Sequence, residues 1–140
     1  MVLIDTPVWS LALRREQHNL NAGEIRLTHA LRKLIRDGRA QVIGVIRQEV
    51  LSGIRAPEKF RTIRDYFRAF DDPKLEIQDY ERAAEMANQC RARGIAGSTI
   101  DFLLCAVANG RGWQILTTDS DFTHFQKVIP IRLLSLPDLL

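Results

Sequence analysis

Three features of the amino-acid sequence predict an α/β fold built on a mostly parallel sheet. Short apolar runs typical of buried strands occur at both ends of the chain, for example Val2 to Ile4 and Trp113 to Thr117. Segments with helical spacing of apolar residues separate these runs. Turn residues mark most of the boundaries. Strands that alternate with helices form parallel sheets, because each helix carries the chain back to the edge where the next strand begins.

The first half of the chain begins with a strand and continues mainly as helices. Thr6 is expected to cap the first helix and Pro7 to be its first residue. Asn21 to Glu24 has the spacing of a capping box and predicts a second helix, which ends at Asp37-Gly38. The remaining expected elements of this half are a strand over 41–44, a helix over 45–53 and a helix from Pro57 to about Phe70.

The second half of the chain repeats this alternation. Asp71-Asp72-Pro73 breaks the preceding helix, and Leu75 and Ile77 predict a brief strand. We further expect a helix over 80–93, a helix from Ser98 to Asn109-Gly110, a strand over 113–117, a helical turn over 121–126 and a last strand over 128–134. The length of 140 residues suits a single domain over 1–140.

Composition and charge limit the classes of function. Net charge is +3, but residues 26–68 hold eleven Lys or Arg and four acids, a local charge of +7. Such a segment suits an anionic partner such as nucleic acid, although solvated helix faces would look the same. No apolar run is long enough to cross a bilayer and no secretory signal is evident, so a cytoplasmic protein is expected. Cys90 and Cys105 are expected to be buried hydrophobes.

Acidic residues occur where a parallel sheet would gather them. Asp5 follows the first strand, and Asp119 and Asp121 follow the strand that ends at Thr117. Ligands bind beyond the carboxyl ends of parallel strands, so these side chains are expected at one sheet edge. Glu49 and Asp101 interrupt apolar helices, where a carboxylate near the core is costly unless a cation or hydrogen bonds compensate it.

Each of these acids also has a simpler explanation. Asp5 could cap the helix that follows it, but Thr6 is expected to occupy that position already. Glu49 could face water. Asp101 lies three residues after Ser98, where the helix dipole favours an acid. Asp119 and Asp121 could be turn residues. The functional interpretation therefore depends on the combination of acids at one edge.

Several carboxylates in one place favour a hard metal ion. They raise one another's pKa unless a cation neutralises them, and oxygen ligands without Cys or His select Mg²⁺ or Mn²⁺. Such ions can activate water for in-line attack on phosphorus. The sequence has no phosphate-binding glycine loop, no nucleophile elbow and no convincing Ser-His-Asp set. Phosphodiester hydrolysis is the chemistry that remains.

At these residues the sequence resembles the PIN-domain family, and within it the toxin nucleases of VapBC-type toxin–antitoxin pairs. The resemblance covers nearly the whole chain. It is carried by four motifs in order: Val2-Leu3-Ile4-Asp5-Thr6 with Val8-Trp9, Val45-Ile46-Arg47-Gln48-Glu49-Val50-Leu51-Ser52-Gly53, Ile100-Asp101-Phe102-Leu103-Leu104-Cys105-Ala106-Val107-Ala108, and Leu116-Thr117-Thr118-Asp119-Ser120-Asp121-Phe122.

The resemblance implies a PIN-like, doubly wound sheet of about five strands flanked by helices. It also implies a Mg²⁺- or Mn²⁺-dependent endoribonuclease that acts as the toxin of a type II toxin–antitoxin system, a cognate antitoxin that covers the active-site groove, and a homodimer. The catalytic and metal-binding acids carried over are Asp5, Glu49, Asp101 and Asp119, with Asp121 as a further metal ligand. Supporting positions are Thr6, Ser10 and Thr117.

The expected mechanism is attack by metal-activated water, which leaves 5′-phosphate and 3′-hydroxyl ends, with Arg47 or Arg55 holding the substrate backbone. Two alternatives stay open: a catalytically silent PIN scaffold and a Mg²⁺-binding regulatory module, each acting through a protein partner. Receiver domains usually need an adjacent acidic pair after the first strand, where this chain has Asp5-Thr6. A haloacid-dehalogenase-type phosphatase needs a second Asp at the position of Pro7.

Overall fold

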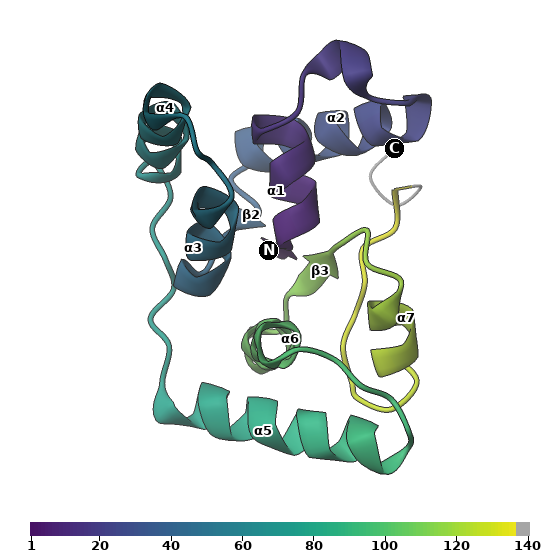
Figure 1. Ribbon diagram of the computed structural model, residues 1–140. Coiled ribbons are helices and arrows are strands. Elements are labelled where there is room, and N and C mark those ends of the chain that lie inside the picture. Colours follow the sequence, from purple (N-terminus) through teal and green to yellow (C-terminus); the bar gives the residue numbers. More distant parts are fainter. Residues whose placement is uncertain (137–140) are drawn as a thin grey trace.

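The computed structural model describes residues 1–136 and has the α/β architecture that the sequence predicts (Figure 1). The elements in chain order are β1 (Val2–Ile4), α1 (Thr6–Leu13), the 3-10 helix η1 (Gln17–Asn19), α2 (Ala22–Arg36), β2 (Ala40–Gln41), α3 (Gly44–Ser52), α4 (Pro57–Phe67), α5 (Ile77–Ala92), α6 (Thr99–Arg111), β3 (Gln114–Leu116) and α7 (Asp121–Phe125).

The sheet is parallel and has the strand order β2-β1-β3. Val2 pairs with Ala40 on one side and with Gln114 on the other. The chain passes from β1 to β2 on one side and then crosses to β3 on the opposite side of β1. The order therefore reverses beside β1, and this switch point is where open α/β sheets form a ligand-binding crevice at the strands' carboxyl ends.

Within residues 1–136 the sheet has three strands, fewer than the five expected. The last expected strand, over 128–134, forms only a single parallel bridge between Leu133 and Ile115. Ile115 donates its N–H to Arg132 O and accepts from Leu134 N, both at 2.8 Å. Pro130 has no N–H to donate, which limits how far this segment can pair with β3.

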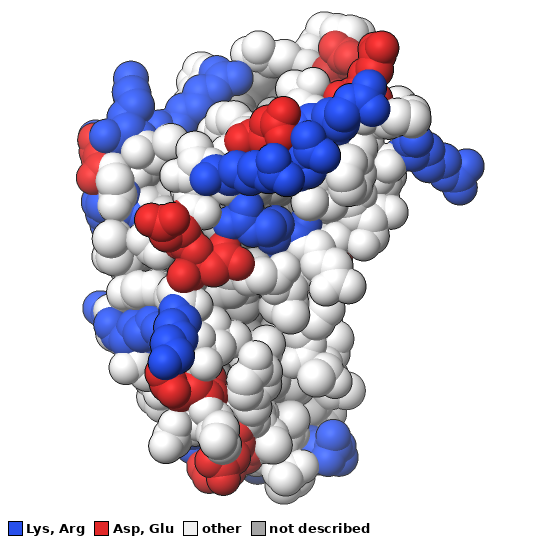
Figure 2. All heavy atoms as spheres, turned by 90° about the vertical axis from the view of Figure 1, so that its left-hand side faces the viewer, with Lys and Arg blue, Asp and Glu red and all other residues white. Residues whose placement is uncertain are grey.

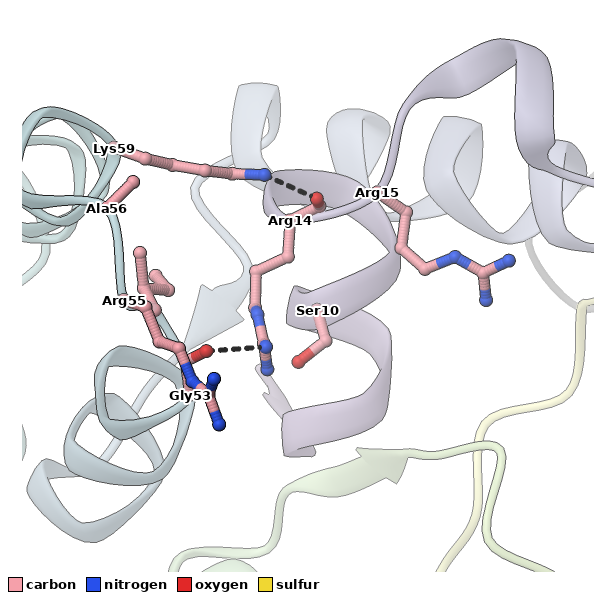
Figure 3. Close-up of a pocket in the computed structure, with 8 residues that line it drawn as sticks. Ser10, Arg14, Arg15, Gly53, Arg55, Ala56 and Lys59 are labelled. Carbon is pink, nitrogen blue, oxygen red and sulfur yellow. Dashed lines mark hydrogen bonds between the residues drawn. The ribbon is translucent and has the colours of Figure 1, made fainter.

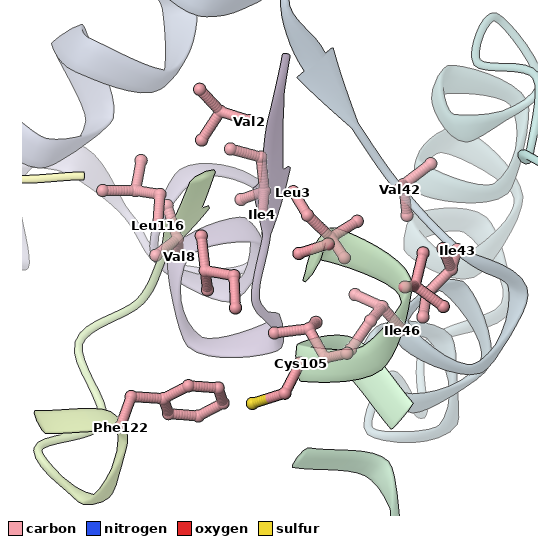
Figure 4. Packing of buried hydrophobic residues seen from close by; sticks show 14 of the residues in the cluster. Val2, Leu3, Ile4, Val8, Val42, Ile43, Ile46, Cys105, Leu116 and Phe122 are labelled. Atoms are coloured by element: carbon pink, nitrogen blue, oxygen red, sulfur yellow. The ribbon is translucent and has the colours of Figure 1, made fainter. Parts of the chain in front are cut away.

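Helices cover the sheet on both sides and enclose the core. Figure 1 shows α1 and α2 on one side of the strands and α6, backed by α5, on the other. Residues of β1 point into an apolar cluster with Val8, Ile46 and Phe122 (Figure 4). Cys90 and Cys105 are free and buried, as expected. Among residues 1–136, no helix is long and apolar enough to cross a membrane.

Local capping chemistry decides where several helices begin. The predicted capping box of Asn21 and Glu24 is present at the start of α2. The expected strand over 75–77 is wrong, and so is the expected start of the next helix at Tyr80. A capping box between Glu76 and Asp79 begins α5 at Ile77, which is 74% exposed. Ile77 is an apolar residue in the first turn of a helix, and together with Leu75 it imitates the alternation of a strand.

Candidate active site

The predicted acidic edge lies at the switch point of the sheet, where β1 and β3 end side by side. Asp5 follows β1 directly, and its N–H donates to Leu116 O of β3 at 3.0 Å. Thr117 follows β3, and its hydroxyl donates to Asp5 Oδ2 at 2.7 Å. The two strand ends are thus joined by one backbone hydrogen bond and one side-chain hydrogen bond.

Asp5 is a buried carboxylate, 6% exposed. Its Oδ1 accepts a hydrogen bond from Thr6 N at 2.8 Å, so Asp5 is the N-cap of α1. The expectation that Thr6 caps this helix is wrong, because Thr6 is already the first helical residue. The pKa of Asp5 is raised from 3.8 to about 6. Burial is the largest cause, the hydrogen bonds from Thr117 and Thr6 oppose it, and the charges of Asp101 and Glu49 contribute to the rise.

Thr117 also fixes the loop that carries Asp119 and Asp121. Its oxygen accepts from Asp119 N at 3.0 Å while its hydroxyl donates to Asp5. Asp119 Oδ1 in turn accepts from Asp121 N at 2.9 Å, which is the turn geometry expected from the simpler explanation of these residues. Asp119 is half-buried, whereas Asp121 is exposed at the start of α7.

Asp101 enters the same region from the first turn of α6. Ser98 caps this helix in a capping box, with Ser98 N donating to Asp101 Oδ2 at 3.0 Å and Asp101 N donating to Ser98 Oγ at 3.1 Å. Burial raises the pKa of Asp101, the Ser98 bonds oppose this, and the charges of Asp119 and Asp121 add to it. Asp101 therefore caps α6 and also interacts electrostatically with Asp119 and Asp121, in the loop that follows β3.

Glu49 lies on α3 and is exposed. Of the two explanations left open by the sequence, the water-facing position is the one observed, because Ile46 and Val50 carry the buried face of this helix. Its negative charge still raises the pKa of Asp5, so Glu49 acts electrostatically on the acidic edge. An exposed acid that influences a buried one fits the open rim of a site.

The side chains of the five acids do not converge on a single point in the structure. Within residues 1–136, no three His, Cys, Asp or Glu side chains lie so that they could hold a metal ion together. Three of the acids are held instead by the local hydrogen bonds described above. Their all-oxygen donor set suits Mg²⁺ or Mn²⁺, and charges that raise one another's pKa favour a neutralising cation. Thr6 Oγ1, beside Asp5, is buried and has no hydrogen-bond partner within residues 1–136. A buried hydroxyl without such a partner is free to bond to a water molecule or to a ligand of a bound ion.

The two arginines expected at the substrate have different surroundings. Arg47 donates to Phe67 O at 2.6 Å, to Phe70 O at 2.9 Å and to Asp72 Oδ1 at 2.5 Å. These bonds tie α3 to the last residue of α4 and to the segment that follows it, so the guanidinium of Arg47 is engaged in holding the fold. Arg55 is exposed and lines an open cavity together with Ser10.

Two further residues of that cavity, Arg14 and Lys59, were missed by the sequence interpretation. Arg14, the C-cap of α1, is four residues after Ser10, and this helical spacing was the available signal. Lys59 comes from α4, and no local pattern linked it to α1. Figure 2 shows that most Lys and Arg side chains on the displayed face lie in its upper half, with a few acids among them.

Comparisons with known proteins agree with this architecture. A comparison with curated proteins gives no match. The solved structure of FitAcB from Neisseria gonorrhoeae matches at a TM-score of 0.76 and 17% identity, over 97% of this chain and 98% of that one. VapBC2 from Rickettsia felis, bound to a DNA fragment from its promoter, matches at 0.70 and 12%, over 96% and 98%. FitAB bound to an IR36 DNA fragment matches at 0.72 and 17%, over 97% and 95%. At these identities the structures establish a shared fold. The family model of the PIN domain matches residues 2–128, and with that match the chain belongs to the PIN-domain family.

Proposed function

We propose that this chain is a divalent-metal-dependent endoribonuclease and the toxin of a type II toxin–antitoxin pair. The observation that carries the proposal is the buried Asp5 at the sheet's switch point, whose pKa responds to the charges of Glu49 and Asp101. Carboxylates that sense one another across three elements, in a chain of the PIN-domain family, form the expected framework for phosphodiester hydrolysis.

Asp5, Glu49, Asp101 and Asp119 would hold one ion or two, with Asp121 as a further ligand. The bound Mg²⁺ or Mn²⁺ would supply activation of a water molecule and neutralisation of charge at the phosphate. The chain's own contribution is orientation. Thr6 N and the Thr117 hydroxyl fix the two oxygens of Asp5, and Ser98 N fixes one oxygen of Asp101.

The partners of this proposal come from the same reasoning. The structural neighbours include VapBC2 and FitAB assemblies, and both of these are bound to DNA fragments. By analogy we propose an antitoxin that covers the acidic edge, a homodimer of this chain and an RNA substrate in the cytoplasm. Strand-scission products should carry 5′-phosphate and 3′-hydroxyl ends, because water rather than the ribose 2′-hydroxyl is the attacking group.

The test is cleavage of a pool of structured RNAs by the purified, antitoxin-free chain in Mg²⁺ or Mn²⁺, with EDTA as the metal-free condition. Glu49→Gln is the informative variant, because Glu49 is exposed and its neutralisation should leave folding intact. Glu81→Gln is the matched control, since Glu81 is an exposed acid on α5, outside the proposed site.

We expect wild type and Glu81→Gln to cut RNA in metal and to stop in EDTA, while Glu49→Gln loses at least about 100-fold in rate. Products with 2′,3′-cyclic phosphate ends would contradict water attack. A folded chain that binds its antitoxin and never cuts RNA would instead identify a silent scaffold or a regulatory module.

A further inference from the structure

A basic cavity lies beside the candidate active site, between α1 and the segment that joins α3 to α4. It has a volume of about 510 Å³, and its eight lining residues include Ser10, Arg14, Arg15, Arg55, Ala56 and Lys59. Figure 3 shows Lys59 reaching across from α4 to the end of α1, with Arg14 and Arg55 below it near Gly53. Four of the eight lining residues are cations, and none is an acid.

The charges of three of these cations are not neutralised by the protein. Arg15 forms an ion pair with Glu24 at 3.7 Å, but Arg14, Arg55 and Lys59 have no carboxylate partner within residues 1–136. Lys59 Nζ donates to Arg14 O at 2.6 Å, and Arg14 Nη2 donates to Gly53 O at 2.9 Å. These bonds hold Arg14 and Lys59 in place and leave their charge uncompensated, which favours an anionic ligand.

The helix that begins at this cavity adds to the same electrostatic preference. Ala56, which lines the cavity, is the N-cap of α4, and no side chain caps this end of the helix. Pro57 occupies the first helical position and has no N–H group. The backbone N–H groups of the residues that follow it in the first turn have no acceptor within the helix and can donate to an external group. A helix N-terminus combined with fixed guanidinium and ammonium groups is a recurring arrangement for binding phosphate.

The cavity is connected to the acidic edge along α1. Ser10 and Arg15 also line a neighbouring cavity with Pro7 and Thr118. Thr118 follows Thr117, whose hydroxyl donates to Asp5. Arg14 lies nine residues after Asp5, which at the helical rise corresponds to about 14 Å. An extended polynucleotide strand can span that separation with a few nucleotides.

We propose that this basic cavity binds a backbone phosphate of the RNA strand being cut, a few nucleotides from the scissile bond. Arg14, Arg55 and Lys59 make the contacts, and the N-terminus of α4 supports them. This inference rests on the proposed ribonuclease function and assigns the phosphate-holding role to the cavity rather than to Arg47. Contacts of this kind position the strand without reading its sequence.

The test measures binding of a fluorescent single-stranded RNA of mixed sequence in EDTA, which prevents cutting, at several salt concentrations. Arg55→Gln is the principal variant, because Arg55 has no hydrogen-bond or ion-pair partner within residues 1–136 and its loss should leave the melting temperature unchanged. Arg61→Gln is the matched control: it removes the same charge from an exposed position on α4, two residues beyond Lys59 and outside the cavity.

We expect Arg55→Gln to weaken binding about three- to tenfold and to reduce the slope of log K against log salt by about 0.7, the value for one lost contact on a single strand. Arg61→Gln should leave that slope unchanged. In Mn²⁺, Arg55→Gln should raise KM for RNA while kcat stays near the wild-type value.

Equal effects of Arg55→Gln and Arg61→Gln would show general surface charge and overturn the assignment of the cavity. The assignment is also overturned if Arg55→Gln leaves RNA binding intact and weakens only antitoxin binding. In both cases the wild-type chain still cuts RNA, so the proposed function is retained. Failure of the wild-type chain to bind or cut any RNA would refute the proposed function itself.

Discussion

Replacement of Asp5 by Asn should stabilise the metal-free protein while removing its proposed activity. Asp5 is 6% exposed and burial raises its pKa from 3.8 to about 6. At a pH between these two values, Asp5 is therefore protonated in the folded protein and ionised in the unfolded chain. Stability attached to that proton is present at low pH and is lost as the pH rises through this window, because the unfolded state binds fewer protons there.

The size of the effect follows from the two pKa values. One pKa unit corresponds to about 1.4 kcal/mol, so ionised Asp5 costs the folded state about 3 kcal/mol at pH 7.5. Asn removes that cost and loses about 1 kcal/mol, because its single carbonyl oxygen cannot replace both acceptors of the carboxylate. The net gain in unfolding free energy at pH 7.5 is about 2 kcal/mol, and it should shrink to about zero by pH 4.5.

Urea unfolding of wild type and Asp5→Asn in EDTA, at pH 7.5 and pH 4.5, measures both quantities. Glu81→Gln serves as the control for removing a carboxylate that lies at an exposed position. The reasoning that burial disfavours the ionised form of Asp5 would be refuted by either of two results. One is a variant with a lower unfolding free energy than wild type at pH 7.5, and the other is a difference in unfolding free energy that does not change with pH.

Two further predictions concern residues around the site. Thr117→Val removes the hydroxyl that joins Asp5 to Asp119 N, so RNA cleavage should fall at least about tenfold with a stability loss of about 1 kcal/mol, measured by initial rates and urea unfolding; unchanged rates would contradict an orienting role. Arg47→Met breaks three hydrogen bonds and should cost about 2–3 kcal/mol of stability while RNA affinity of the folded protein stays unchanged; a stable variant with weak RNA binding would return Arg47 to the substrate site.

The sequence predicts where the candidate acids lie in the fold better than it predicts the bounds of the elements that carry them. The placement of Asp5 and Asp119 beyond strand ends needed only the order of strands and helices, and the parallel sheet confirms it. Capping chemistry was readable where both partners of a box were recognised, as at Asn21 and Ser98. It failed at Asp5, because Thr6-Pro7 imitates a cap followed by a first helical residue.

Other features depended on tertiary structure that local patterns do not encode. Exposure of Glu49 follows from how α3 packs through Ile46 and Val50. The engagement of Arg47 depends on carbonyl groups about twenty residues away in sequence. The basic cavity joins α1 to α4 through Lys59 and Arg14, which are 45 residues apart. Contacts between residues so far apart in sequence are set by the tertiary structure, and no local sequence pattern predicts them.

The most direct test of the proposed metal site is Mn²⁺ binding to the purified chain, measured by calorimetry at pH 7.5. Wild type, Asp5→Asn and Asp101→Asn are compared with Glu81→Gln as the control. We predict that wild type and the control bind Mn²⁺ equally and that each of the other two variants binds at least about tenfold more weakly. Wild-type affinity in Asp5→Asn and Asp101→Asn, or no binding by wild type, would contradict the claim that these acids form one metal site.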